Sequence, residues 1–166
     1  MPTKERDLND LFLDTLKDIY FAEKKILTAL PKLAKGAQSD ELKAAFEKHE
    51  AETEDQVARL EQIFKIVGEK AAGKTCPAIM GIIEEGQEIM AEYKGTKALD
   101  AGLVSAAQAV EHYEIARYGT LKTWAQELGI HDAVKLIDTT LAEEKQTDAD
   151  LTKLAEASAN QKAEAA

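Results

Sequence analysis

With 166 residues, the chain is long enough to form one domain whose hydrophobic core needs no disulfide or structural metal. Its formal net charge of −10 at pH 7 argues against nucleic acid or an anionic membrane as a partner, since both attract basic surfaces. Residues 1–10 are too charged for a signal peptide, and no apolar run approaches the roughly 18 residues of a membrane span. The single cysteine permits no internal disulfide. We therefore expect a cytoplasmic protein.

Good helix formers dominate the sequence and runs of β-branched residues are few, so the expected fold class is all-α. The sequence predicts four long helices, at about 5–35, 39–67, 97–128 and 131–158, and a short helix at about 77–93. Gly36 and Ser39 are expected to end the first long helix and to cap the second, Gly129 to end the third, and Pro31 to kink the first. A frayed tail is expected over 159–166, which carries no apolar pattern.

The predicted connections differ in length. Two are tight turns, and the third, over 68–96, is long and contains the short helix. Two tight hairpins joined by one long crossover are typical of a ferritin-like four-helix bundle. The short helix is rich in isoleucine and methionine, more than a solvated connector needs, so we expect it against the bundle or at a dimer interface.

Each predicted long helix carries a stripe of apolar residues at spacings of three and four, and polar residues interrupt each stripe near its centre. In chain order these residues are Glu23, His49, Glu52, Glu111, Glu114 and Glu144. Glu23 and Glu52 lie 13 residues before Gly36 and after Ser39, so both lie about 20 Å from that turn. Glu114 and Glu144 lie 15 residues on either side of Gly129. One carboxylate from each long helix is therefore expected at the same level.

Several carboxylates cannot remain ionised together in an apolar core unless something neutralises them. Protons, a buried basic side chain or divalent metal could do so, and Arg117 is the one basic residue expected on the inner face of its helix. We therefore predict a metal site, with Glu23, His49, Glu52, Glu111, Glu114 and Glu144 as ligands. Carboxylate-rich sites of this kind suit iron or manganese, and we expect two ions per chain, with Glu52 and Glu144 near or at bridging positions.

The individual assignments have alternatives. His49 is equally compatible with a ligand and with a core histidine. Asp148 could be a ligand, a hydrogen-bond partner of a ligand or a salt-bridge partner. Glu143 and His112 fall off the stripes and are expected to be exposed. Hydrogen bonds to ligating carboxylates could come from Thr53, Gln56, Tyr20, Tyr113 or Tyr118, although tyrosines in a bundle more often serve in packing. The two Glu-x-x-His motifs of diiron bundles are absent from this sequence.

Four segments carry a resemblance to a known family: IYFAEKKIL (19–27), KHEAETEDQ (48–56), AQAVEHYEIARYGTLKTWAQELG (107–129) and TLAEEKQTDADLTKLA (140–155). They resemble the YciF/YciE-type bacterial stress-response proteins, a ferritin-like family. The resemblance implies a cytoplasmic homodimer of helical bundles, related in fold to rubrerythrin and manganese catalase. It also implies that the family's inward acidic positions correspond to the glutamates named above, with His49 beside them.

Two functions follow as hypotheses. In the first, a dinuclear iron or manganese centre acts on peroxide or dioxygen, or handles the metal itself, and any catalysis is that of a metal-dependent oxidoreductase. In the second, the protein is a metal-free helical bundle that assembles and protects other components under stress. No organic cofactor is expected, and Cys76 lies in no recognisable nucleophile motif.

Overall fold

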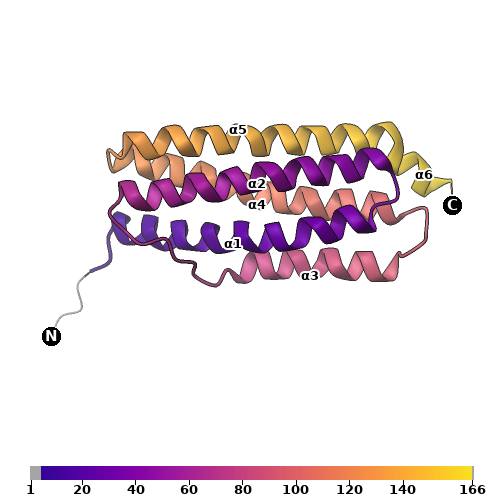
Figure 1. The fold of residues 1–166 in the computed structure, drawn as a ribbon, viewed down its shortest axis with the longest axis horizontal. Helices are drawn as coiled ribbons and strands as arrows, with labels where there is room; N and C mark the ends of the chain where they lie inside the picture. The colour runs from indigo at the N-terminus through magenta and orange to yellow at the C-terminus, as the bar shows by residue number, and fades with distance from the viewer. Residues whose placement is uncertain (1–4, 166) are drawn as a thin grey trace.

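The computed structural model describes residues 5–165, and this range is helical apart from its connections (Figure 1). The long helices are α1 (Leu8–Gly36), α2 (Asp40–Ile66), α4 (Leu99–Glu127) and α5 (His131–Leu154). The shorter α3 (Pro77–Glu92) lies in the connection between α2 and α4. The predicted helices are all present and the all-α fold class is confirmed, with bounds that differ by a few residues. Residues 1–4, the start of the single domain predicted over 1–166, lie outside the described residues.

The four long helices form a ferritin-like bundle of two antiparallel hairpins. Helix α1 packs against α2 and helix α4 against α5, and contacts of α1 with α4 and of α2 with α5 join the hairpins. Helix α3 runs along the outside of the bundle, against α1 and α4 (Figure 1). Among the helices described, none has an apolar stretch long enough to cross a bilayer.

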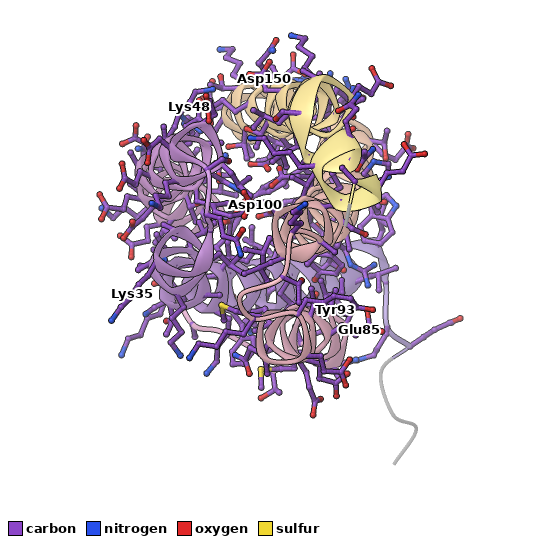
Figure 2. The ribbon with its side chains drawn as sticks, turned by 90° about the vertical axis from the view of Figure 1, so that its right-hand side faces the viewer. Lys35, Lys48, Glu85, Tyr93, Asp100 and Asp150 are labelled. Carbon is purple, nitrogen blue, oxygen red and sulfur yellow. The ribbon has the colours of Figure 1, made fainter. Side chains whose placement is uncertain are left out.

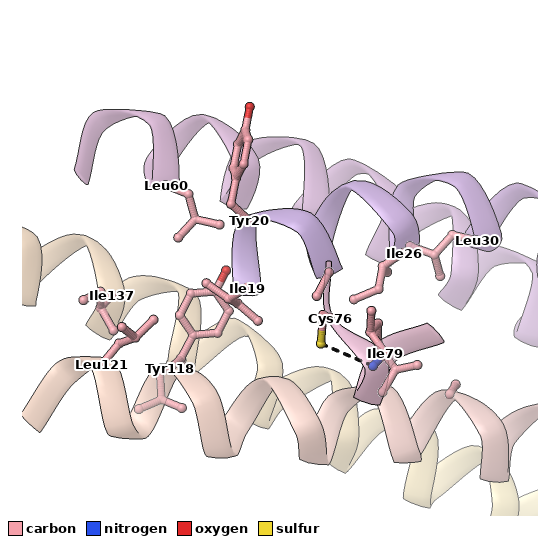
Figure 3. Close-up of a cluster of buried hydrophobic side chains, with 14 of the residues drawn as sticks. Ile19, Tyr20, Ile26, Leu30, Leu60, Cys76, Ile79, Tyr118, Leu121 and Ile137 are labelled. Atoms are coloured by element: carbon pink, nitrogen blue, oxygen red, sulfur yellow. Dashed lines mark hydrogen bonds between the residues drawn. The ribbon is translucent and has the colours of Figure 1, made fainter. Parts of the chain in front are cut away.

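Local signals in the sequence account for the helix ends. Ser39 caps α2, its hydroxyl oxygen accepting a hydrogen bond from the backbone N–H of Leu42 at 3.3 Å. Gly129 follows α4 with a φ of +71°, a conformation that glycine adopts without steric cost. Pro31 lies inside α1, and the kink expected there stays a prediction. Cys76, a buried thiol, caps α3 through the backbone N–H of Ile79 (Figure 3).

Asp100 on α4 joins the two hairpins at one end of the bundle. Its carboxylate accepts hydrogen bonds from the backbone N–H groups of Gln38 at 2.8 Å and Ser39 at 2.9 Å, just before α2. Asp100→Ala is expected to lower the free energy of unfolding by about 2 kcal/mol, because two backbone donors lose the charged acceptor that a buried side chain provides. Urea denaturation of metal-free protein measures the change. Ser39→Ala is the control, with an expected loss of about 1 kcal/mol in the free energy of unfolding. Equal denaturation midpoints for Asp100→Ala and wild type would contradict the prediction.

The expectation of a frayed tail from residue 159 onward is wrong for residues 159–164. A π-helix over Ala155–Ala159 continues from α5 and leads into α6 (Asn160–Glu164). No glycine or proline interrupts this segment, Ala159 is buried, and both elements contact α4. Helical propensity and this packing explain why the helix extends beyond the last long apolar side chain. Ala166, the end of the predicted tail, lies outside the described residues.

The crossover helix α3 covers the bundle instead of standing free in solvent. Ile79 is fully buried against the core, whereas Met80, one residue on, is 44% exposed. The packing of α3 against α1 and α4 therefore confirms one of the two placements predicted for it.

The core is apolar toward both ends of the bundle. Figure 3 shows Ile19, Leu60, Leu121 and Ile137 on one side of the drawn region, and Ile26, Leu30 and Ile79 on the other. Charged side chains project outward around the helices, as the end-on view in Figure 2 shows for Lys35, Lys48 and Glu85. Glu23 lies between Ile19 and Ile26 along α1, which places a carboxyl group between the two apolar regions.

Candidate metal centre

Four of the predicted ligands form one buried cluster at mid-bundle. His49 comes from α2, Glu111 and Glu114 from α4, and Glu144 from α5. Each is at most 2% exposed, and each contributes one potential ligand atom that lies within 4.8 Å of the other three. The spacing of three residues between Glu111 and Glu114 places both carboxylates on the same face of α4.

The imidazole of His49 lies among the three carboxylates. Its Nδ1 lies 3.0 Å from Oε1 of Glu111. Its Nε2 lies 4.0 Å from Oε2 of Glu114 and 3.9 Å from Oε2 of Glu144. The two ring nitrogens therefore face different carboxylates, with Glu111 on one side and the other two on the opposite side.

Several polar atoms of this cluster are buried without a hydrogen-bond partner among residues 5–165. They are both carboxylate oxygens of Glu111, both of Glu114, Oε2 of Glu144 and Nε2 of His49. Leaving one such atom unpaired costs about 1–3 kcal/mol, and more when the group is charged. A bound divalent cation would satisfy these atoms together, so the donor set fits a metal ion. Three carboxylates and one imidazole form a set that suits iron or manganese.

Glu23 lies beside this cluster, completely buried. Its Oε1 accepts a hydrogen bond from the Tyr118 hydroxyl, while Oε2 has no hydrogen-bond partner in the described part of the chain. The other two tyrosines considered in the sequence donate elsewhere, Tyr20 to Glu61 and Tyr113 to Asp18. Tyr118 is therefore the tyrosine that holds a candidate ligand.

Burial and mutual repulsion favour the protonated forms of these carboxyl groups in the metal-free protein. Burial raises the pKa of Glu23 to about 8, with a further increase from the negative charge of Glu144. Burial also raises the pKa of Glu111 to about 8. The pKa values of Glu114 and Glu144 are raised well above their usual range, chiefly by burial and further by neighbouring glutamates. The metal-free site therefore holds protons that a cation would displace.

Glu52, the remaining predicted ligand, lies outside the cluster. Its side chain is 25% exposed, and its carboxylate lies 3.3 Å from Nζ of Lys48. It also accepts a hydrogen bond of 3.4 Å from the Thr147 hydroxyl. Because Thr53 occupies the buried position next to it, the structure directs the Glu52 side chain toward the edge of the site. A ligand role for Glu52 stays a prediction.

The expectation that Glu143 is exposed is wrong. Its two oxygens accept hydrogen bonds of 2.6 and 2.7 Å from Arg59, and the side chain is half-buried. Gln56 donates from its Nε2 to Glu143 at 3.2 Å and also to Glu144. The hydrogen bond from Gln56 to a candidate ligand agrees with the sequence prediction, whereas the pair of Arg59 with Glu143 was missed, although Arg59 follows Gln56 by three residues, the spacing that places two side chains on one helix face. Arg59 and Gln56 thus support Glu144 from outside the cluster.

Arg117 does not neutralise the cluster, contrary to the role considered for it. Its side chain is 43% exposed, its Nε lies 3.9 Å from Asp18, and its guanidinium lies over the Tyr113 ring. His112 is exposed, as predicted, and its Nε2 lies 3.2 Å from Asp148. Of the described residues, only His49 forms ion-pair contacts within the cluster, and these join it to Glu111, Glu114 and Glu144.

The profile of a protein family described as a domain of unknown function (DUF892) matches residues 7–164 of this chain. The chain belongs to the DUF892 family. This DUF892 protein is 43% identical over 160 residues to protein YciF of Escherichia coli (strain K12). The alignment covers 96% of each protein. The match confirms the resemblance to the YciF-type proteins.

Two solved structures show how closely the DUF892 fold is shared. The E. coli stress protein YciF matches with a TM-score of 0.87 and 43% identity, over 91% of this chain and 96% of that one. YcfI from Rhodopseudomonas palustris, suggested to be a structural protein, matches with a TM-score of 0.87 and 45% identity. That match covers 92% of this chain and 97% of YcfI.

Proposed function

We propose that this DUF892 protein binds two iron or manganese ions per chain at the buried cluster, and that the bound metal acts on peroxide or dioxygen under stress. The observation that carries the proposal is the set of unpaired ligand atoms on His49, Glu111, Glu114 and Glu144, buried within 4.8 Å of one another. An ordinary structural core pairs such atoms.

Charge balance supports two ions instead of one. Glu23 adds a fourth buried carboxylate to those of Glu111, Glu114 and Glu144. Four ionised carboxylates carry a charge of about −4, which two divalent cations neutralise and one does not. Dinuclear sites in four-helix bundles are built in this way, from inward-facing glutamates and histidines on facing helices.

The protein's own residues would position the ligands. Tyr118 holds Glu23, and Gln56 holds Glu144, each through a hydrogen bond to a carboxylate oxygen. His49 presents Nε2 toward Glu114 and Glu144 while its Nδ1 faces Glu111. When bound, a pair of redox-active ions supplies two electrons to an oxidant, chemistry that none of these side chains provides.

The competing function is that of a metal-free assembly or protective protein. The observation that favours it is the similarity to YcfI, which has been suggested to be a structural protein. In that case the buried glutamates would remain protonated, and the bundle would function equally well without metal.

Elemental analysis decides between the two functions. Protein expressed with added iron and manganese, and purified without a chelator or affinity tag, is expected to carry about two equivalents of metal per chain. Glu114→Gln is expected to lose this metal, because an amide cannot replace an anionic ligand. Glu47→Gln is the matched control, since Glu47 is exposed on α2 near His49. A wild-type protein without metal, even after metal is added back, would leave the assembly function as the better account.

A further inference from the structure

A narrow cavity of about 30 Å³ lies between α1, α3 and α4 and ends at the cluster. Its inner end is formed by His49 and Glu111, both buried. Its walls are apolar and include Ile26, Leu30, Ile82, Ile83, Met90 and Val110. Lys32 and Gln87, both exposed, lie at its outer end. The cavity is therefore lined by exposed residues and by two candidate ligands.

Small residues at the contact between α3 and α4 explain why the cavity exists. Gly86 on α3 faces Ala106 on α4, and a Cβ atom at position 86 would lie 3.4 Å from Cβ of Ala106. Ala29 on α1 and Ala107 on α4 also line the cavity. Larger side chains at these positions would fill the space, so the cavity depends on their small size.

We propose that this cavity admits dioxygen, a small uncharged molecule, from the surface near Lys32 and Gln87 to the cluster. An ion would lose several kcal/mol of hydration between apolar walls, whereas an apolar diatomic molecule loses little. The volume holds one or two molecules of the size of water. The use of dioxygen at the cluster rests on the proposed function, but binding of dioxygen in the cavity does not.

Methyl NMR of the metal-free protein under oxygen pressure tests the proposal. Dioxygen is paramagnetic, so methyl groups that contact it relax faster. The methyl groups of Ile82, Ile83 and Met90 are expected to show a several-fold larger enhancement than those of Ile115 and Leu136. All five residues are partly buried, and Ile115 and Leu136 do not line the cavity, so exposure alone predicts no such difference.

A variant that fills the cavity makes the test specific. Ala29→Leu is expected to remove the excess relaxation at Ile82 and Ile83, and Ala106→Leu serves the same purpose if the first variant folds poorly. Ala34→Leu on the same helix is the matched control, because Ala34 is half-buried but does not line the cavity.

The outcomes separate this proposal from the proposed function. Equal enhancement at the cavity and control methyl groups, or enhancement that persists in both filled variants, would overturn the cavity assignment even if the protein binds metal. Selective enhancement in a protein that binds no metal would support the cavity and contradict the proposed function. In metal-loaded protein, Ala29→Leu is expected to slow oxidation by dioxygen while leaving the metal content unchanged. Unchanged oxidation by dioxygen in that variant would overturn the role of the cavity as the access route.

Discussion

The metal-free protein is expected to lose several kcal/mol of stability as the pH rises from 5 to 8, and added iron or manganese is expected to restore it. In the folded protein the pKa values of Glu23 and Glu111 are raised to about 8, from an ordinary value of 4.5. Between pH 4.5 and about 8, both carboxyl groups hold protons in the folded state that they have released in the unfolded state. Stability therefore falls as the pH rises through this window and is greatest below pH 4.5 as far as these groups are concerned.

Thermal denaturation of chelator-treated protein at several pH values measures this effect. A Tm decrease of roughly 10 °C between pH 5 and 8 is expected for a change of several kcal/mol in a chain of this size. Metal added at pH 8 should raise the Tm, because it binds the deprotonated carboxylates of the folded state. A stability that is constant or rises over this range would contradict the prediction.

Two neighbouring glutamates on α5 are expected to respond in opposite directions to the same substitution. Glu144→Gln should stabilise the metal-free protein at pH 8 by about 1–4 kcal/mol, because the buried carboxyl group must take up a proton on folding at this pH, whereas the amide is already neutral. The amide keeps the shape of the side chain and can still accept a hydrogen bond from Gln56. The same variant should lose bound metal, so stability and metal binding oppose each other at this position.

Glu143→Gln is the matched control. It should destabilise the protein by about 1–2 kcal/mol, since the bidentate pair with Arg59 is lost, and it should retain bound metal. Urea denaturation with and without metal measures both variants. A metal-free Glu144→Gln protein that is less stable than wild type at pH 8 would contradict the view that this carboxylate is a liability without metal.

Sequence patterns were sufficient for the bundle and for most of the cluster. The breaks in the apolar stripes correctly placed Glu23, Glu111, Glu114, Glu144 and His49 in the core. Those positions are determined by helix periodicity, because a residue three or four positions from buried neighbours on both sides has nowhere else to point. The length of the crossover was equally informative, because only a bundle of two hairpins needs a long connection.

Residues at the margin of a stripe were harder to predict. Glu52 and Thr53 follow His49 by three and four residues, so periodicity allows either to face inward, and in the structure Thr53 is the buried one. The same ambiguity applies to Arg117, three residues after Glu114, which turns toward Asp18. Glu143 depends on Arg59 from another helix, a long-range pairing that no local pattern contains.

The cluster draws its side chains from three helices that are far apart in the sequence, α2, α4 and α5. An ion held there would act as a reversible cross-link that closes long chain loops, as a disulfide does in an oxidising compartment. Unfolding of the loaded protein would then require release of the ion, so resistance to proteolysis would depend on metal supply. The lifetime of the folded chain in a cell would become a measure of available metal, with no separate sensor needed.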